Sequence, residues 1–329
     1  MQVTSKDLLM DDPPKERYDY VTVGHVTRDV IEDRGGGAIS QPGGGAFYSA
    51  LQAARLGLRA LIVTQGVPQE IRALLEPFRD ELDLRVIPAK HTTTLSTRGL
   101  GARRSQRLLA WAGPIVEPLS LDAKILHLAP VARETPSAFQ GQADFIGLTP
   151  QGLVRRWEQS EDVPLGQLDT GALLGDLPLS GGGDATLAGD ISPVALDPDL
   201  LPERFSAAVI SEDECEGCHA LFTVARRGGA YVAVTAGSRP ATVHLPTPAA
   251  ESVLQTGVPR IVEARDDLGA GDVFAAAFFV ALHEGHGPLE AATFANAAAA
   301  MRIAEVGAGA IATRGRIEAT MSIDPPQPA

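Results

Sequence analysis

The stretch from Tyr18 to Gly66 decides the fold class of this chain. It begins with YDYVTVGHV (18–26), a run rich in β-branched residues that is typical of a buried strand. After a glycine-rich insert it continues as AFYSALQAARLGLRALIVTQG (46–66), in which an alanine- and leucine-rich helix stops at Gly57 before a second strand. A strand, a helix and a strand in this order predict a right-handed crossover within a parallel sheet.

Short apolar runs and helices continue to alternate along the rest of the chain. Strands are predicted over 123–131, 143–150, 205–211 and 230–237, and helices over about 212–227, 271–285 and 289–307. The predicted fold class is therefore α/β, with a central, mostly parallel sheet flanked by helices in three layers.

Two segments break this alternation, and both are predicted to belong to a small β lid. Residues 30–42 are rich in glycine, and residues 91–113 join a threonine-rich half to a turn at Gly99 and Gly101. Open α/β sheets bind ligands at the carboxyl ends of their strands, where such a lid would cover the site. We expect one domain over 18–320, flexible ends at 1–17 and 321–329, and a loop over about 160–189.

The composition limits the classes of function. The chain has 329 residues, of which 44% are hydrophobic, and a formal net charge of −13, which argues against a nucleic-acid partner and against a basic membrane anchor. No apolar run reaches the roughly 18 residues of a membrane-spanning helix. The N-terminus has no basic start followed by an apolar stretch, and there are only two cysteines, so we expect a cytoplasmic protein without a membrane partner.

The stretch RDDLGAGDVF (265–274) is the strongest candidate for chemistry. Gly269, Ala270 and Gly271 form a turn at the predicted start of a helix, where backbone N–H groups and the helix dipole favour an anion. A phosphoryl group in transfer is such an anion, and it needs mainly positioning and charge stabilisation. Asp272, in the first helical turn, could take the proton of an acceptor hydroxyl. The alternative is an aspartate that only complements the helix dipole.

This stretch resembles the second signature of the ribokinase (PfkB) family of carbohydrate and nucleoside kinases, which runs Asp-Thr-Thr-Gly-Ala-Gly-Asp-x-Phe. Asp266, Asp272 and Phe274 match, as does the Gly-Ala-Gly turn between them. Asp267 and Leu268 replace the two threonines of the signature. The resemblance implies an anion hole at the turn and a catalytic base at Asp272.

A second block is similar to the first signature of the same family, a pair of glycines that opens a helix ending in Ala-Arg-Leu-Gly. Here it stands as PGGGAFYSALQAARLG (42–57). The resemblance implies that Gly43, Gly44 and Gly45 line the acceptor site. Tyr48 stands near the place where family members often carry Asn, and we expect it to contact the acceptor as well.

Shorter matches follow in the family's order. VGHVTRD (23–29) resembles the end of the first strand, where the family supplies a sugar-binding aspartate, here Asp29. ISEDE (210–214) has Ser211 in place of the family's Asn and keeps Glu214, which would act on magnesium through water.

The last two matches concern the nucleotide. VTAGS (234–238) resembles a strand end beside the nucleotide and implies contacts from Thr235 and Gly237. FANAAAA (294–300) would place Asn296 near the adenine.

The resemblance implies a ribokinase-like fold and an ATP-dependent transfer to a hydroxyl of a small polyol or sugar-like acceptor. It further implies Mg²⁺ with the nucleotide, a monovalent cation near Asp266 and a homodimer formed through the lid. GHVTRDVI, GGGAFYSAL and APVARETP are most similar to the archaeal myo-inositol kinase branch, which would put Arg133 and Arg155 near the pocket.

Alternative functions stay open. The departures at Asp267, Leu268, Tyr48 and Ser211 leave room for a kinase-fold module that binds ligand with little or no turnover. A nucleoside kinase is a further alternative, as is a sugar-phosphate kinase, for which the lid arginines 103, 104 and 107 would clamp the acceptor phosphate. A dinucleotide oxidoreductase is rejected because no G-x-G-x-x-G follows the first strand, and no P-loop motif occurs.

Two further motifs are interpreted as structural. CEGCH (215–219) matches the haem-attachment pattern, but on a helix its two thiols share one face and are expected to be partly buried. HEGH (283–286) ends a predicted helix, where histidines complement the dipole, and it lacks the H-E-x-x-H spacing of a zinc protease.

Overall fold

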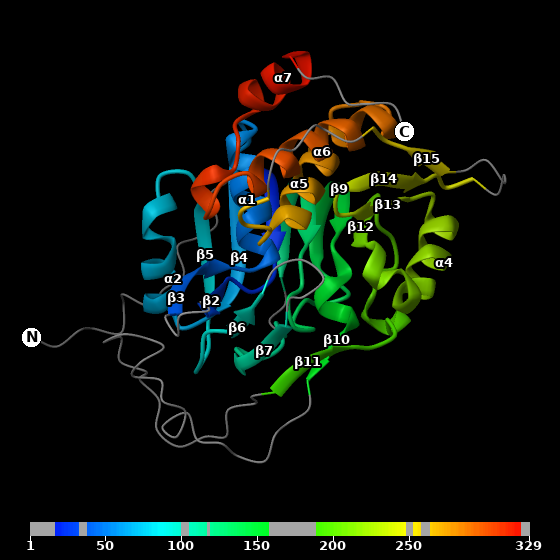
Figure 1. The fold of residues 1–329 in the computed structure, drawn as a ribbon. Coiled ribbons are helices and arrows are strands. Elements are labelled where there is room, and N and C mark those ends of the chain that lie inside the picture. Colours follow the sequence, from blue (N-terminus) through cyan, green and yellow to red (C-terminus); the bar gives the residue numbers. More distant parts are fainter. Residues whose placement is uncertain are drawn as a thin grey trace, which may run out of the picture.

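A nine-stranded sheet forms the middle layer of the molecule (Figure 1). The computed structural model describes residues 17–32, 38–99, 105–116, 119–157, 189–247, 253–257 and 264–323. The strand order is β15–β14–β13–β12–β9–β8–β1–β4–β5, parallel from β13 to β5 and antiparallel for β14 and β15. In chain order the strands are β1 (Tyr18–Val23), β4 (Ala60–Gly66), β5 (Asp83–Pro88), β8 (Ser120–Leu128), β9 (Gln140–Leu148), β12 (Ala207–Ser211), β13 (Tyr231–Ala236), β14 (Arg239–His244) and β15 (Val253–Gln255).

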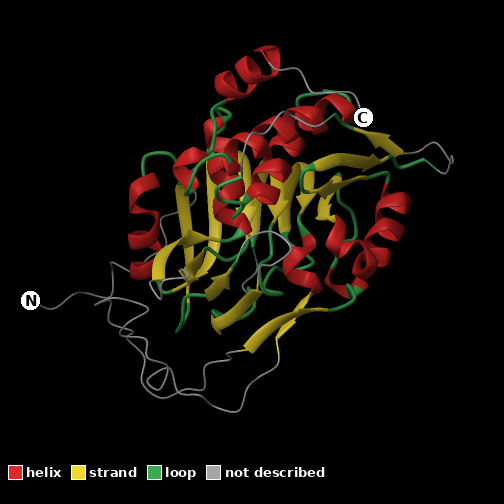
Figure 2. Cartoon of the chain, in the orientation of Figure 1, coloured by secondary structure: helices red, strands yellow, loops and turns green. Residues whose placement is uncertain are grey.

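Helices cover both faces of this sheet (Figure 2), so the three predicted layers are confirmed. One apolar core joins the sheet to the first group of helices: α1 (Gly45–Arg55), α2 (Pro68–Leu75), α5 (Ala270–His283), α6 (Pro288–Ile303) and α7 (Arg314–Ile323). A second core on the other face takes in the 3-10 helix η6 (Glu212–Cys218) and α4 (His219–Gly228).

Helix α5 is buried on all sides, which explains why its sequence is apolar in every direction. Every residue from Val273 to Ala281 is buried, and the helix packs against both α1 and α6 as well as the sheet. Gly147 of β9 lets the ring of Phe279 lie directly on the strand, because a Cβ at that position would collide with it. The carboxyl-terminal half of α5 thereby packs directly on the sheet.

A second sheet of six strands forms the lid, in the order β10–β11–β7–β6–β2–β3. Its strands are β2 (Thr27–Glu32), β3 (Ala38–Gly43), β6 (Thr94–Arg98), β7 (Ser105–Ala110), β10 (Arg155–Trp157) and β11 (Gly189–Pro193). The predicted lid is confirmed and is larger than expected, because β10 and β11 extend it. Asp29 lies within β2 and pairs across to Gln41 of β3.

β1 begins at Tyr18, and α7 runs to Ile323, three residues past the expected end of the domain. Most of the loop expected over 160–189 lies outside the described residues, as do Arg103 and Arg104. Within the described ranges, no helix is both long and apolar enough to cross a membrane.

Candidate active site

The Gly-Ala-Gly turn lies at the amino end of α5, as its sequence predicts. Gly269 takes a left-handed conformation with φ of 72°, and α5 begins at the next residue. Gly271 is exposed, and a Cβ built on it would meet nothing within 4 Å, so there is open space beside the turn. An anion in that space would face the amino end of a 14-residue helix.

Asp272 lies against the first signature block. A Cβ built on Gly45 would lie 2.8 Å from Asp272 Oδ1 and 3.3 Å from the Cβ of Ala129, which follows β8. Ser49 Oγ also donates a hydrogen bond to the main-chain oxygen of Asp272, at 3.3 Å. The first turns of α1 and α5 therefore meet at the carboxyl end of β8, with the Asp272 carboxylate between them.

The three predicted acceptor glycines each lie against a different group. A side chain on Gly43 would collide with the Asp29 carboxylate, and one on Gly44, which has φ of 93°, would collide with the main-chain oxygen of His25. Asp29 is 4% exposed and accepts a hydrogen bond of 2.7 Å from Thr27 Oγ1. Residues two apart in a chain lie at most about 7 Å apart. This single turn therefore brings the carboxylates of Asp29 and Asp272 into one small region.

Tyr48 lies beneath the Gly-Ala-Gly turn. A side chain on Gly269 would collide with the Tyr48 ring, which is 2% exposed. Burial is also the largest cause that raises the pKa of the Tyr48 hydroxyl well above its usual value. This placement favours a supporting role beneath the turn over the acceptor contact that was predicted.

Glu134 is a buried residue that the sequence motifs did not single out. It is 1% exposed, and its carboxylate accepts hydrogen bonds from the backbone N–H groups of His25 (2.8 Å), Val131 (2.8 Å) and Ala132 (2.7 Å). The loops after β1 and β8 are thereby tied together at the carboxyl edge of the sheet. No local pattern could reveal this contact, because His25 lies 109 residues away.

The lid is joined to the same loops. Thr93 Oγ1 lies 2.7 Å from His25 Nδ1 and accepts the backbone N–H of Ala112 at 3.0 Å. Arg155 donates to the main-chain oxygen of Val131 (3.4 Å) and to Gln106 Oε1 in β7 (3.0 Å). Arg155 therefore lies where the lid meets the loop after β8, which also carries Arg133 in a left-handed conformation with φ of 59°.

Three of the predicted donor-site residues lie at neighbouring strand ends. Ser211 of β12 pairs with Thr235 of β13, and Thr235 Oγ1 donates to the main-chain oxygen of Ile210 at 3.3 Å. Gly237 follows β13 with φ of 61°, and Glu214 lies in the first turn of η6. These positions share the carboxyl edge of the sheet with the turn at Gly269.

Asn296 has other partners in the structure. It lies in the middle of α6, and its Nδ2 donates to Thr256 Oγ1 (2.7 Å) and to the main-chain oxygen of Gly257 (3.2 Å), just after β15. Residues 258–263, which follow this contact, are outside the described part of the chain.

The described acidic residues fit a magnesium ion that keeps most of its water. They form no group of three or more His, Cys, Asp or Glu side chains able to hold a metal by themselves. Glu214 Oε2 accepts the backbone N–H of Ser211 at 2.8 Å, which fixes the carboxylate at the end of β12. Magnesium is usually bound through one or two carboxylates, several waters and the substrate phosphates, so a single fixed Glu214 is consistent with it.

The two cysteines are poor candidates for metal or haem attachment. Both are free thiols, and Cys218 is fully buried. Burial, reinforced by Glu214, raises the pKa of Cys218 to about 12, so the thiol stays protonated at neutral pH. Helix packing is what this motif provides.

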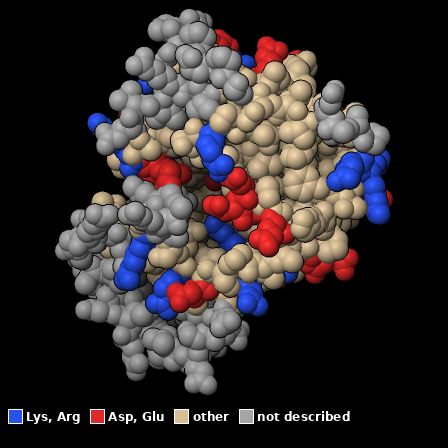
Figure 3. Space-filling view, turned by 45° about the vertical axis from the view of Figure 1, so that its right-hand side comes forward, with Lys and Arg blue, Asp and Glu red and all other residues tan. Residues whose placement is uncertain are grey.

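Figure 3 shows acidic side chains gathered around a hollow on one face, with basic side chains beside them.

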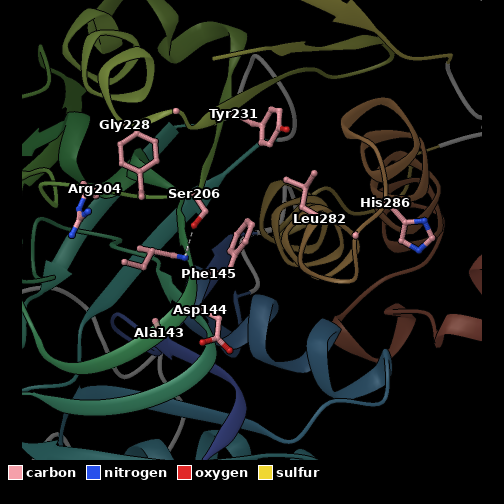
Figure 4. Close-up of a pocket in the computed structure, with 13 residues that line it drawn as sticks. Ala143, Asp144, Phe145, Arg204, Ser206, Gly228, Tyr231, Leu282 and His286 are labelled. Carbon is pink, nitrogen blue, oxygen red and sulfur yellow. Dashed lines mark hydrogen bonds between the residues drawn. The ribbon is translucent and has the colours of Figure 1, made fainter. Parts of the chain in front are cut away.

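A cavity of about 630 Å³ lies away from the predicted site residues, at the amino-terminal edge of the sheet (Figure 4). It is lined by Phe145, Ser206, Tyr231 and Leu282 among others, and it includes none of the predicted site residues. The candidate site and this cavity therefore lie at opposite edges of the sheet.

Comparisons with known proteins agree with this arrangement. Residues 203–314 match the family model described as pfkB family carbohydrate kinase. No curated protein sequence matches the chain.

Solved structures share the fold over nearly the whole chain. A pyrophosphate-dependent kinase of the ribokinase family, complexed with a pyrophosphate analogue and myo-inositol, is 16% identical, with a TM-score of 0.64 over 91% of this chain and 99% of that one. Arabidopsis thaliana ribokinase, complexed with ribose and ATP, is 17% identical, with a TM-score of 0.63 over 93% and 99%. Vibrio cholerae fructokinase, bound to fructose, ADP and calcium, is 18% identical, with a TM-score of 0.59 over 92% and 98%.

The family match covers the segment that contains Glu214, Asp272 and Asn296, and the fold match covers 93% of the chain. The predicted family and fold class are both confirmed. The chain thus has the fold of the ribokinase-family kinases, and its residues 203–314 match the pfkB family carbohydrate kinase model.

Proposed function

We propose that this protein transfers the γ-phosphoryl group of ATP to a hydroxyl of a small polyol or sugar-like acceptor. The observation that carries the proposal is the turn of Gly43 to Gly45, which lies against Asp29 on one side and Asp272 on the other. Because these glycines have no side chain, both carboxylates can approach the backbone of the turn closely. Asp29 would hold the acceptor hydroxyls while Asp272 accepts the proton of the reacting one.

The turn of Gly269 to Gly271 would stabilise the transferring phosphoryl oxygens. Its N–H groups belong to the first turn of α5, and the open space at Gly271 gives the group room beside Asp272. The negative Asp272 would then face the acceptor rather than the phosphate, so that the two functions do not oppose each other.

Magnesium, when bound with the nucleotide, would neutralise charge on its phosphates. Glu214 is the residue we assign to hold the ion's water, and Thr235 and Gly237 would lie beside the nucleotide. Asn296 would contact the adenine after exchanging its bond to Thr256. The lid, joined to the acceptor loop through Thr93 and Arg155, would exclude water that competes with the acceptor.

An acceptor and donor panel tests this proposal. Purified protein with Mg²⁺ is incubated with ATP or pyrophosphate and with polyols, including myo-inositol, sugars, sugar phosphates and nucleosides, and the phosphorylated product is detected by mass spectrometry. Pyrophosphate and myo-inositol are included because a solved kinase of this fold is complexed with a pyrophosphate analogue and with myo-inositol. We expect ATP-dependent phosphorylation of a neutral polyol or sugar.

The same panel separates the alternatives. Phosphorylation of nucleosides alone, or of sugar phosphates alone, would replace the proposed acceptor class. Binding of ATP without any product would identify a ligand-binding module that has lost turnover.

A further inference from the structure

Arg302 is a fully buried charge close to the candidate anion hole, and nothing in the proposed chemistry uses it. It lies in the last turn of α6 and is 0% exposed. A buried guanidinium is stable only where oxygen atoms compensate its charge. The identity of those oxygen atoms indicates what the residue does.

Three oxygen atoms converge on the Arg302 guanidinium. Nη2 donates to Asp266 Oδ2 at 2.8 Å, and Nη1 donates to the main-chain oxygens of Glu305 at 3.2 Å and of Asp266 at 3.4 Å. Carbonyl and carboxylate oxygens are the ligands that hard metal cations take in proteins. The place beside Asp266 where a monovalent cation was expected is therefore occupied by a side chain of the protein.

Asp266 is held in its charged form at this place. Burial by itself would raise the pKa of the Asp266 carboxyl, but hydrogen bonds from Arg302 and from the N–H groups of Gly307 and Leu268 outweigh burial and lower it. The side chains of Arg302 and Asp266 thus form a buried ion pair, exposed by only 0% and 9%.

Two routes connect Arg302 to the Gly-Ala-Gly turn. Through Asp266, whose Oδ1 accepts the N–H of Leu268 at 3.0 Å, it fixes the residue just before Gly269. Through Tyr48, whose ring centroid lies 5.4 Å from Arg302 Cζ, it supports the ring beneath Gly269.

We propose that Arg302 is a built-in cation that positions the anion-hole turn and replaces a dissolved monovalent cation beside Asp266. In its catalytic consequence this inference rests on the proposed phosphoryl transfer, but the occupancy of the Asp266 position by Arg302 does not. The protein should therefore not depend on K⁺ or Na⁺, because a guanidinium attached to the chain is always present.

The occupancy is tested without an activity assay. The Tm of the wild type is measured in potassium, sodium and tetramethylammonium chloride at equal ionic strength, and we expect the same Tm in all three. Arg302→Gln should lower Tm in tetramethylammonium, and K⁺ should restore part of the loss by entering the vacated position. Arg314→Gln is the matched control, because Arg314 binds the Glu284 carboxylate and the main-chain oxygen of Leu56 away from this turn. It should lose stability without a response to K⁺.

The positioning role is tested on the transfer reaction. Arg302→Gln should lower kcat about tenfold, less than the loss of a direct oxyanion donor because Arg302 acts through Asp266. The KM for the acceptor should stay unchanged, K⁺ should recover part of the rate, and Arg302→Lys should recover more of it.

Several results would overturn the inference. A wild type whose Tm rises in KCl relative to tetramethylammonium chloride binds a dissolved cation, and this holds even if Arg302→Gln does not fold. An Arg302→Gln protein that folds but shows no K⁺ response in Tm has only lost a structural ion pair. If no acceptor is phosphorylated at all, the proposed function fails. The Tm series still decides whether Arg302 or a dissolved cation occupies the position beside Asp266.

Discussion

Gly45 shows why a glycine is needed next to the candidate base. The space that a Cβ would fill there is limited by Asp272 Oδ1 at 2.8 Å and by the Cβ of Ala129 at 3.3 Å. Backbone conformation is not the reason, since Gly45 lies within α1 and does not have a positive φ. The glycine therefore serves the position of the carboxylate.

Gly45→Ala should displace the Asp272 carboxylate while leaving the helix intact. A misplacement of about 1 Å at a reacting group can reduce rates by about a hundredfold, so we expect kcat to fall by one to two orders of magnitude with ATP affinity unchanged. Steady-state kinetics and calorimetric ATP binding measure the two effects. Gly228→Ala in α4, where a Cβ meets nothing within 4 Å, is the control and should keep wild-type kinetics. If Gly45→Ala keeps the wild-type kcat, the position of the Asp272 carboxylate does not depend on the absence of a side chain at residue 45.

Single residues differ in how far the sequence reveals them. Gly45, Gly269 and Asp272 stand in local patterns with a direct physical meaning, and the structure brings them together. Tyr48 and Glu134 could not be interpreted in this way. For each of them one decisive neighbour lies more than a hundred residues away in the chain: Gly269 for Tyr48 and His25 for Glu134.

At the scale of elements, β3 is an edge strand of the lid within the described part of the chain. It is the last strand of the six-stranded sheet, and its Ile39 side chain is 67% exposed. An edge strand with an exposed large apolar side chain is a site for pairing with another chain. This supports the homodimer through the lid as a proposal.

Ile39→Lys should therefore shift the protein from dimer to monomer, because a charged side chain would be buried at the edge of the second lid. Light scattering after size exclusion measures the mass. Val116→Lys is the control, since Val116 is 81% exposed but lies outside the lid strands. A wild type that is monomeric at all accessible concentrations, or an Ile39→Lys variant that stays dimeric, would rule out this edge as the interface.

Elements were predictable where their hydrophobic pattern is local. The strands of the parallel sheet and the helices α1, α5 and α6 follow from apolar runs and from glycines that end them. β10 and β11 were not predicted. Each strand is short, and 31 undescribed residues separate the two strands in the chain. No short turn motif therefore predicts that they pair.

For the whole molecule, buried histidines link stability to pH. His127 is fully buried between Tyr20 and Thr149. Its Nδ1 lies 3.0 Å from the Tyr20 hydroxyl, and its Nε2 lies 3.0 Å from the Thr149 hydroxyl. Burial lowers the pKa of His127 to about 3, and burial likewise lowers the pKa of His25. Both histidines are therefore neutral in the folded protein where they would be charged in the unfolded chain.

The sign of the effect follows from proton binding. Below the unfolded pKa of about 6.5, the unfolded chain binds protons at these positions that the folded protein does not. The free energy of unfolding therefore decreases as the pH is lowered. His127 alone should contribute a slope of about 1.4 kcal/mol per pH unit until pH approaches its folded pKa. Urea unfolding of the wild type and of His127→Gln measures the slope, which should be smaller in the variant. Equal slopes would mean that His127 binds a proton in the folded state.

The central claim is that Asp272 accepts the proton of the acceptor hydroxyl while the turn before it holds the phosphoryl group. Asp272→Asn keeps the shape of the side chain and removes the base, so it tests this claim most directly. Single-turnover transfer to the best acceptor of the panel and calorimetric ATP binding are measured on this variant, with Asp80→Asn on the exposed surface as control.

We predict that transfer by Asp272→Asn falls by about 10²- to 10⁴-fold, while its ATP affinity stays that of the wild type. Transfer at the wild-type rate by Asp272→Asn would contradict the assignment of Asp272 as the base.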